Sequence, residues 1–190
     1  MKFKDSSKRR VILFIAMSLD GYIADEQGSV EWLEQIEGEG DNGYNDFIEQ
    51  VDTIFMGRHT YEVIQGFDMP FPYQDKQCYV FSRSSQQADE HVTPIQEELI
   101  SWVPQQLEQS GKHIWLMGGG QLVHEFLQHH WIDEMIITIA PVMLGSGIPL
   151  FREGFPTSSW IAQETRSYGQ LVTLHYVKPD LLQSPAPDQQ

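Results

Sequence analysis

The sequence predicts an α/β fold, with a mostly parallel central sheet flanked by helices and an antiparallel hairpin at the C-terminal end. The first observation is that apolar runs of strand length alternate with amphipathic segments over the first two-thirds of the 190 residues. The second is the run at 11–17, which has no polar alternation and is typical of a strand covered on both faces. The third is a pair of strand patterns, 160–168 and 171–178, around Gly169 and Gln170.

The individual elements follow from short apolar runs and from helical periodicity. A continuous apolar run predicts a buried strand, and apolar residues spaced by three or four predict a helix with one buried face. Pro104 must lie in the first turn of its helix or break it, because proline lacks a backbone N–H. The expected strands are 11–17, 53–56, 77–81, 113–117 and 134–142. The expected helices are 60–65, 98–110, 121–129 and one that carries the stripe Tyr44, Phe47, Ile48 and Val51.

One domain accounts for the sequence. There is no composition shift or internal repeat, and 190 residues are enough for one substantial core. We expect the domain to span 11–178, with flexible tails at 1–10 and 179–190. The single cysteine, Cys78, excludes an intramolecular disulfide, and its apolar neighbours predict a buried strand residue. No segment approaches transmembrane length, so the cytoplasm is the expected location.

The charge of the chain narrows its function. A net charge of −15 and a pI of about 4.6 argue against general binding to nucleic acids or anionic membranes, which requires a basic face. Any phosphate ligand must therefore be held by local positive groups such as Arg58 and Arg83. The histidines do not repeat at ligand spacing on one helical face, so we expect no metal site.

Two junctions between a strand and a helix are suited to phosphate. The first junction consists of Gly57, Arg58, His59 and Thr60, and the second runs from 118 to 122. Helix N-termini bind anions through free backbone N–H groups, and arginine matches phosphate oxygens with a forked pair of donors. Two such junctions in one α/β domain suggest a dinucleotide, although glycine at such a turn can also serve backbone geometry alone.

Six segments occur in an order that resembles a known family. They are 16–24, 28–33, 56–62, 80–83, 114–120 and 132–151. Together they resemble the bacterial dihydrofolate-reductase-like family, and within it the branch related to the reductase domain of bifunctional riboflavin biosynthesis proteins. The resemblance extends over nearly the whole chain.

This resemblance implies that NADPH lies across the carboxyl ends of the parallel strands, where open α/β sheets bind ligands. The first junction would hold the pyrophosphate and 2′-phosphate side, and the second would seat the pyrophosphate and the nicotinamide ribose. Ser82 and Arg83 would flank the adenosine 2′-phosphate, Ala16 and Ile23 would frame the nicotinamide, and the loop 20–32 would close over the site. The implied cofactor-binding residues are Ala16, Ile23, Gly57, Arg58, His59, Thr60, Ser82, Arg83, Gly118, Gly119, Gly120, Gln121 and Leu122.

The substrate side departs from the family pattern. Met117 stands where riboflavin-pathway reductases carry a glutamate, which speaks against a riboflavin-pathway substrate. Dihydrofolate reductases hold the pterin ring with an acidic residue on the first helix, and alignment places Gly43 there with Asp41 nearby. Asp41 is therefore a candidate catalytic proton donor or a turn former. Asp20 is a candidate catalytic and substrate-contacting group or a turn carboxylate.

Two functions remain open. One is an NADPH-dependent reductase that transfers hydride to a small heterocyclic substrate, pterin-like or aminopyrimidine-like. Trp32 would be a wall of its substrate pocket or a loop anchor, and Gly145 would shape the rim. The alternative is a non-catalytic NADP(H)-binding or nucleotide-binding protein of the same fold. The resemblance also implies a homodimer, for which the apolar segments 142–144 and 148–151 are candidate interface residues.

Overall fold

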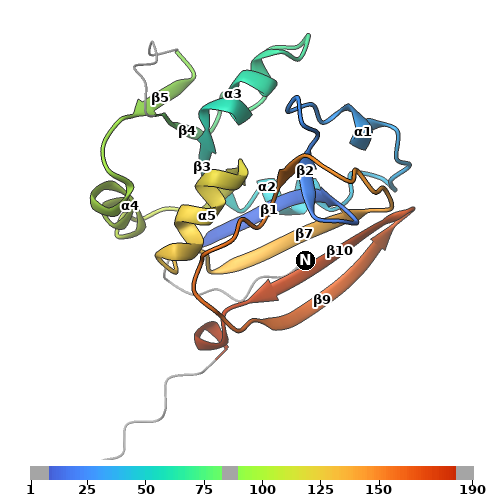
Figure 1. Cartoon of the computed structure of the whole chain (residues 1–190). Coiled ribbons are helices and arrows are strands. Elements are labelled where there is room, and N and C mark those ends of the chain that lie inside the picture. The colour runs from blue at the N-terminus through green and yellow to red at the C-terminus, as the bar shows by residue number, and fades with distance from the viewer. Residues whose placement is uncertain (1–8, 83–89, 183–190) are drawn as a thin grey trace, which may run out of the picture.

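The computed structural model describes residues 9–82 and 90–182, and an eight-stranded sheet runs through its centre (Figure 1). The strands of this sheet are Val11–Ser18 (β1), Val51–Gly57 (β3), Gln77–Phe81 (β4), Val92–Ile95 (β5), His113–Gly118 (β6), Glu134–Ala140 (β7), Ile161–Tyr168 (β9) and Leu171–Val177 (β10). Their order across the sheet is β5-β4-β3-β6-β1-β7-β10-β9. Every neighbouring pair from β5 to β7 is parallel, whereas β10 is antiparallel to both β7 and β9.

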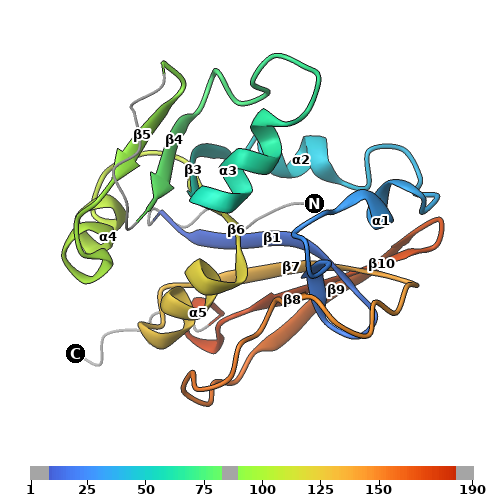
Figure 2. The same ribbon diagram turned by 45° about the horizontal axis from the view of Figure 1, so that its top comes forward.

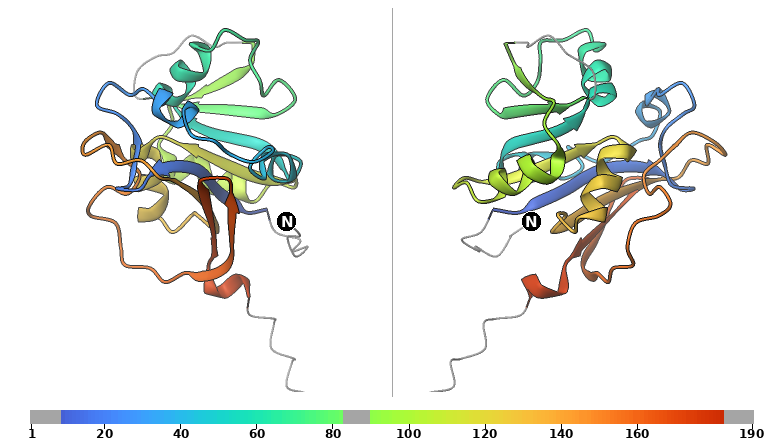
Figure 3. Two further views of the ribbon diagram at one scale, coloured as in Figure 1. Left: turned by 90° about the vertical axis from the view of Figure 1, so that its right-hand side faces the viewer. Right: turned by 60° about the vertical axis from the view of Figure 1, so that its left-hand side comes forward.

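This architecture confirms the predicted fold class, including the antiparallel hairpin at the C-terminal end. The two hairpin strands pair directly at Tyr168 and Leu171, on either side of a two-residue turn. Gly169 in that turn has a φ of 59°, a conformation that glycine adopts without steric cost. Figure 3 shows the hairpin at one end of the twisted sheet and β4 and β5 at the other.

Helices cover both faces of the sheet (Figure 2). One face packs against α4 and α5, and the other against α2 and α3. Within the described residues, none of the helices combines the length and the apolar character that crossing a lipid bilayer requires. The helices are Glu31–Glu34 (α1), Tyr44–Ile48 (α2), Arg58–Gln65 (α3), Leu99–Leu107 (α4), Gly120–Gln128 (α5) and the short 3₁₀ helix Pro179–Leu181 (η1).

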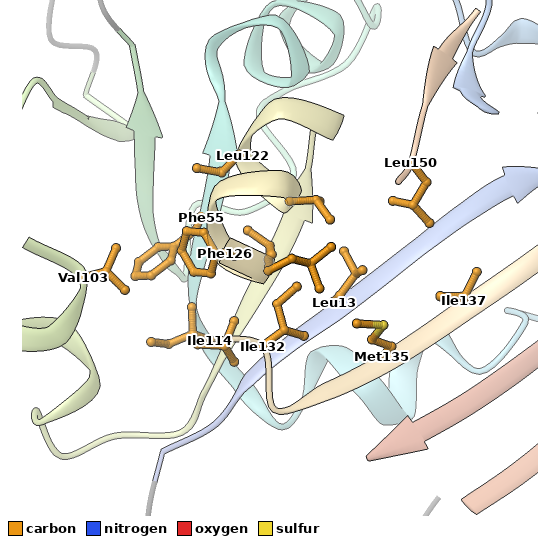
Figure 4. Packing of buried hydrophobic residues seen from close by; sticks show 14 of the residues in the cluster. Leu13, Phe55, Val103, Ile114, Leu122, Phe126, Ile132, Met135, Ile137 and Leu150 are labelled. Atoms are coloured by element: carbon orange, nitrogen blue, oxygen red, sulfur yellow. The ribbon is translucent and has the colours of Figure 1, made fainter. Parts of the chain in front are cut away.

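Aromatic side chains connect the helices to the strands beneath them. On the α4 and α5 side, the ring of Phe55 lies 5.5 Å from that of Trp102 and 6.0 Å from that of Phe126. Figure 4 shows Phe55 beside Phe126 in this cluster. On the other side, Phe14 of β1 stacks on Phe47 of α2 with ring centroids 4.1 Å apart. The central strands therefore bury apolar side chains on both faces, which explains their continuous apolar sequence.

Several features differ from the sequence patterns. Strand β5 was not expected; it contains Pro94 and lies at the sheet edge, where a missing N–H is tolerated. Tyr22–Ala24 (β2) and Ile148–Pro149 (β8) form a separate two-stranded sheet that is too short to leave a pattern. Pro104 lies in the middle of α4 and not in its first turn, because packing of the helix on the sheet outweighs one lost hydrogen bond. Val51 begins β3 instead of extending α2.

The amino ends of the strands carry a buried ionic network. Arg10 is 7% exposed and donates to the carboxylate of Glu134 at 2.5 Å, and Glu134 is fully buried. The second carboxylate oxygen of Glu134 lies 2.8 Å from Nε2 of His175. Arg9 pairs with Asp52. Arg9 and Arg10, which were expected in the flexible tail, are therefore fixed to the end of the sheet opposite to the carboxyl ends of the parallel strands.

Candidate functional site

A cleft of about 1420 Å³ lies at the carboxyl ends of the central parallel strands. Its floor includes Ala16 near the end of β1, Gly57 at the end of β3 and Met117 in β6. Open α/β sheets bind ligands at this edge, and pockets that hold one drug-sized ligand typically measure roughly 300–1,000 Å³. The cleft therefore has room for a dinucleotide together with a second small molecule.

The strand order divides this cleft into three parts: one beside β4, one over the two junctions and one beside β1. Ser82 follows β4 and Ala16 belongs to β1, and the two strands that lie between β4 and β1 lead into the two junctions. A ligand that spans the cleft therefore passes from Ser82, over the junctions, to the β1 side. We call the lining on the β1 side the apolar arm, which consists of Ala16, Ile23, Ala24, Val30, Leu33, Met117, Ile148 and Pro149.

The first junction turns the extended backbone of β3 directly into α3. Gly57 has φ −75° and ψ 160°, and the helix begins at Arg58. The guanidinium of Arg58 lies 2.6 Å from the carboxylate of Glu62, one turn further along α3, and both side chains are about half exposed. Such surface pairs contribute only about 0–1 kcal/mol, so a phosphate can compete for this guanidinium at little cost.

The second junction depends on glycine. Gly118 has a φ of 120°, which L side chains rarely adopt, and a side chain there would approach Cδ1 of Ile15 at 3.1 Å. Helix α5 then begins at Gly120, after Gly119 as its N-cap. The first backbone N–H groups of a helix have no partner within the helix and lie at the positive end of its dipole. The residues at the start of α5, from Gly119 to Leu122, line the cleft.

Direct contacts hold the two junctions and β8 together. The backbone N–H of Gly119 donates to the hydroxyl oxygen of Thr60 at 3.0 Å, which ties the start of α5 to the start of α3. A side chain on Gly120 would come within 2.4 Å of the carbonyl oxygen of Pro149. The backbone of β8 therefore lies against the start of α5, at the border of the apolar arm.

The loop between β2 and α1 also packs on the first junction. Gly28 has a φ of 85°, and a side chain there would come within 2.1 Å of Nε2 of His59. Gly147 has a φ of 147°, and a side chain there would come within 2.2 Å of the carbonyl oxygen of Ala24. The loop therefore lies at the entrance of the cleft, and glycine is favoured at Gly28 by its positive φ and at Gly147 by its positive φ and the close backbone of Ala24.

Charged side chains surround the cleft at its outer parts. Glu97 and Glu98 line it before α4, and Glu125 lines it from α5. Arg152, an exposed residue after β8, lines it as well. Ser82 lines the cleft as expected, while Arg83 lies outside the described residues. Sequence reasoning missed Arg152, although an arginine in a chain of net charge −15 is itself a signal.

Asp20 and Gly145 lie together but do not line the cleft. The carboxylate of Asp20 accepts a hydrogen bond from the hydroxyl of Ser18 at 2.6 Å and from the backbone N–H groups of Leu144 and Gly145 at 3.1 and 2.7 Å. The Ser18 hydroxyl, with the two backbone donors, holds the pKa of Asp20 below its ordinary value. Asp20 therefore connects the turn after β1 to the segment after β7.

Asp41 and Trp32 also lie outside the lining of the cleft. The carboxylate of Asp41 accepts hydrogen bonds from the backbone N–H groups of Asn45 at 2.8 Å and Gly43 at 3.1 Å, which lower its pKa. It therefore stabilises the start of α2 as a turn former does. Trp32 lies in α1, and its indole N–H is buried without a hydrogen-bond partner among the described residues.

Most of the predicted cofactor residues nevertheless surround this one cleft. Within the described ranges, no group of three or more His, Cys, Asp or Glu side chains is arranged to hold a metal ion. The predicted residues that do not line the cleft are Gly118, Asp20, Asp41, Trp32 and Gly145. Those that line it are Ala16, Ile23, Gly57, Arg58, His59, Thr60, Ser82, Gly119, Gly120, Gln121 and Leu122.

Comparisons with known proteins agree with the fold and extend over the cleft. The model of the RibD C-terminal domain family matches residues 9–174. The uncharacterized protein YwjB of Bacillus subtilis (strain 168) is 49% identical over 172 residues, which cover 90% of this chain and 99% of that protein.

Solved structures extend this comparison. A protein from Shewanella sp. PV-4 assigned to riboflavin biosynthesis superposes with a TM-score of 0.77 at 30% identity, covering 88% of this chain and 98% of that one. Dihydrofolate reductase from Enterococcus faecalis, solved with NADP(H) and RAB-propyl, gives a TM-score of 0.63 at 15% identity, covering 90% and 97%. The similarity to the dihydrofolate reductase shows that the two proteins share a fold.

Proposed function

The chain belongs to the RibD C-terminal domain family, a family of reductase type, and from that premise we propose that it is an NADPH-dependent reductase. Its substrate would be a small heterocyclic or conjugated ring compound that accepts a hydride. The observation that carries the proposal is the pair of glycine junctions on one cleft, joined by the hydrogen bond between Gly119 and Thr60. Two helix N-termini at the centre of one cleft match a ligand with two linked phosphates.

The residues of the cleft fit such a cofactor. A side chain at Gly120 would collide with the backbone of Pro149, and Gly118 has a φ that favours glycine, so the second junction keeps bare backbone beside the cleft. Gly57, His59 and Thr60 would hold one side of the pyrophosphate, and Arg58 would exchange Glu62 for an oxygen of the 2′-phosphate. Gly120, Gln121 and Leu122 would hold the other side through backbone N–H groups, and Gly119 would line it while its own N–H stays bonded to Thr60. Ser82 would face the 2′-phosphate, and Ala16 and Ile23 would face the nicotinamide.

The chain's own contribution to the reaction is binding, orientation and exclusion of water. NADPH supplies the hydride when it is bound, so the protein has to place the acceptor against one face of the nicotinamide ring. The apolar arm provides a dry wall for that contact. The loop fixed by Gly28 and Gly147 keeps this wall in place before ligands bind, which lowers the ordering cost of binding.

The direct test of cofactor choice is Arg58→Ala, with Arg166→Ala as the matched control. Arg166 also pairs with a glutamate, Glu164 at 2.7 Å, but it lies on β9 away from the cleft. Fluorescence titration should show weaker NADPH binding by about tenfold, or about 1.4 kcal/mol, for Arg58→Ala and almost unchanged NADH binding. An equal loss for both cofactors would contradict a 2′-phosphate contact, and the control should bind like the wild type.

Single-turnover oxidation of bound NADPH separates this function from the non-catalytic alternative. The acceptor panel should include dihydropterins, pteridines, aminopyrimidines and quinones. Transfer of a hydride to any of these compounds excludes a protein that only binds nucleotides. Tight NADPH binding without turnover on the whole panel would favour that alternative. The expected homodimer stays a prediction, and sedimentation equilibrium tests it separately.

A further inference from the structure

If the protein is the proposed NADPH-dependent reductase, the side chains of the apolar arm determine which hydride acceptor can lie beside the cofactor. The inference below therefore rests on the proposed function. Its wall comes from five elements: Ala16 from β1, Ile23 and Ala24 from β2, Leu33 from α1, Met117 from β6 and Ile148 from β8. Burying a charged group among such side chains without a partner carries a large desolvation penalty. The arm therefore favours an acceptor that is flat, apolar and uncharged.

Two carboxylates that flank the arm along the chain, those of Asp20 and Asp25, are engaged with backbone N–H groups. Asp25 accepts a hydrogen bond from the backbone N–H of Ser29 at 2.8 Å, and Asp20 accepts one from Gly145 at 2.7 Å. The hydrogen bonds from the Ser18 hydroxyl and from backbone N–H groups hold the pKa of Asp20 below its ordinary value, so its carboxylate has no proton to give. Within the described residues neither carboxylate lines the cleft. None of the eight residues of the arm is acidic, and the acidic residues that line the cleft, Glu97, Glu98 and Glu125, lie outside the arm.

We infer that the arm takes an uncharged quinone as the hydride acceptor and that solvent, not a side chain, supplies the proton. A quinone accepts hydride as a neutral molecule, whereas the C=N bond of a pterin needs a proton on nitrogen as hydride arrives. The quinone gains two electrons with one hydride from NADPH and one proton from solvent. One C–H bond of the cofactor breaks, two O–H bonds form, and hydroquinone and NADP⁺ leave.

Arg152 is the feature that could favour a different acceptor. It lines the cleft three residues after Pro149 and is exposed to solvent. A guanidinium at the cleft mouth can pair with a sulfonate, carboxylate or phosphate on an acceptor. Because such a pair at an exposed position is worth only about 0–1 kcal/mol, the apolar arm dominates the choice.

Equilibrium binding tests the choice of acceptor without turnover. The protein saturated with NADP⁺ is titrated with naphthoquinone and with naphthoquinone sulfonate, which have the same ring system. We expect the neutral compound to bind at least about tenfold more tightly, which corresponds to about 1.4 kcal/mol. Tighter binding of the sulfonate, lost in Arg152→Gln, would overturn the inference and identify Arg152 as an anion contact.

A charge placed in the arm should reverse this preference. In Leu33→Lys, we expect the ratio of the two dissociation constants to shift toward the sulfonate by about tenfold. Leu182→Lys places the same charge at the end of η1, outside the cleft lining, and should leave the ratio unchanged. An unchanged ratio in Leu33→Lys, with folding intact by circular dichroism, would show that the acceptor binds elsewhere.

Turnover tests the source of the proton. NADPH oxidation with naphthoquinone should be independent of pH across the neutral range and should persist in Asp20→Asn. A loss on the order of 10²-fold in kcat for Asp20→Asn, with unchanged NADPH and quinone binding, would indicate a side-chain acid and overturn the inference. Failure of the wild type to bind NADPH removes the proposed function and this inference with it. NADPH binding with a preference for the sulfonate overturns the inference alone.

Discussion

The hydroxyl oxygen of Thr60 accepts a hydrogen bond from the backbone N–H of Gly119 at 3.0 Å, and this bond joins the starts of α3 and α5. The two residues are far apart in the sequence, yet each belongs to a junction between a parallel strand and a helix. The bond fixes the spacing of the two helix N-termini. It thereby sets the distance over which a ligand with two linked phosphates can be held.

The first prediction concerns this bond. Thr60→Val keeps the shape of the side chain but leaves the N–H of Gly119 unpaired, which costs about 1–3 kcal/mol. We expect a lower free energy of unfolding in urea and NADPH binding weakened by about tenfold. Thr60→Ser keeps the hydroxyl and should retain most of both. If Thr60→Val and Thr60→Ser bind NADPH equally well, the bond does not position the junctions.

A second prediction compares two glycines at equivalent junctions. A side chain on Gly120 would come within 2.4 Å of the carbonyl oxygen of Pro149, whereas one on Gly57 would find its nearest neighbour at 3.7 Å. Gly120→Ala should therefore destabilise the protein by about 1–3 kcal/mol, because backbone has to move. Gly57→Ala should leave the thermal midpoint nearly unchanged. Equal midpoints for both variants would contradict the close packing of β8 on α5.

The third prediction concerns how the buried ionic network affects the stability of the protein at low pH. Burial alone raises the pKa of Glu134, but hydrogen bonds from His175 and Arg10 outweigh it and leave the pKa below the ordinary value of 4.5. The unfolded chain therefore binds a proton at higher pH than the folded chain. The stabilisation from Glu134 is complete above the unfolded pKa and is lost as pH falls through the folded pKa.

Urea unfolding at a series of pH values measures this effect. Glu134→Gln should cost about 3–5 kcal/mol at neutral pH, because Arg10 and His175 stay buried but lose the negative charge that they face. The variant should also lose part of the decline in stability below about pH 5. A variant whose stability declines with acid as steeply as that of the wild type would show that Glu134 does not titrate in this way.

The fourth prediction compares two tryptophans. The indole N–H of Trp32 is buried and has no partner among the described residues, whereas that of Trp115 donates to the carbonyl oxygen of Phe14 at 2.9 Å. Trp32→Phe removes an unpaired donor and should change the free energy of unfolding by less than about 1 kcal/mol. Trp115→Phe removes a paired donor and should cost about 1–3 kcal/mol. Equal costs would indicate that Trp32 has an acceptor after all.

The fold was predictable because its central strands carry a strong pattern. Strand β4 spans Gln77–Phe81 as expected, since an apolar run between two polar segments has clear limits. Strands β2 and β8 escaped detection because each has only two or three residues, and their pairing is a long-range contact. Arg9 and Arg10 looked like a solvated tail, because their partners lie far away in the sequence.

The candidate site was predictable only in part for the same reason. Glycines at strand ends, such as Gly57 and Gly119, mark the cleft locally, and both line it. The position of a carboxylate depends on tertiary contacts that no local pattern contains. Asp20 accepts a hydrogen bond from Gly145, which lies 125 residues further along the sequence. Arg152 lines the cleft shortly after β8, whose pairing with β2 is a long-range contact.

Calorimetric titration of the wild-type protein with NADPH, with NADH in parallel, tests the central claim most directly. The account predicts saturable binding of NADPH with micromolar affinity and a preference over NADH of at least about tenfold, or about 1.4 kcal/mol. The absence of saturable binding for both cofactors would contradict the assignment of the two junctions to a dinucleotide.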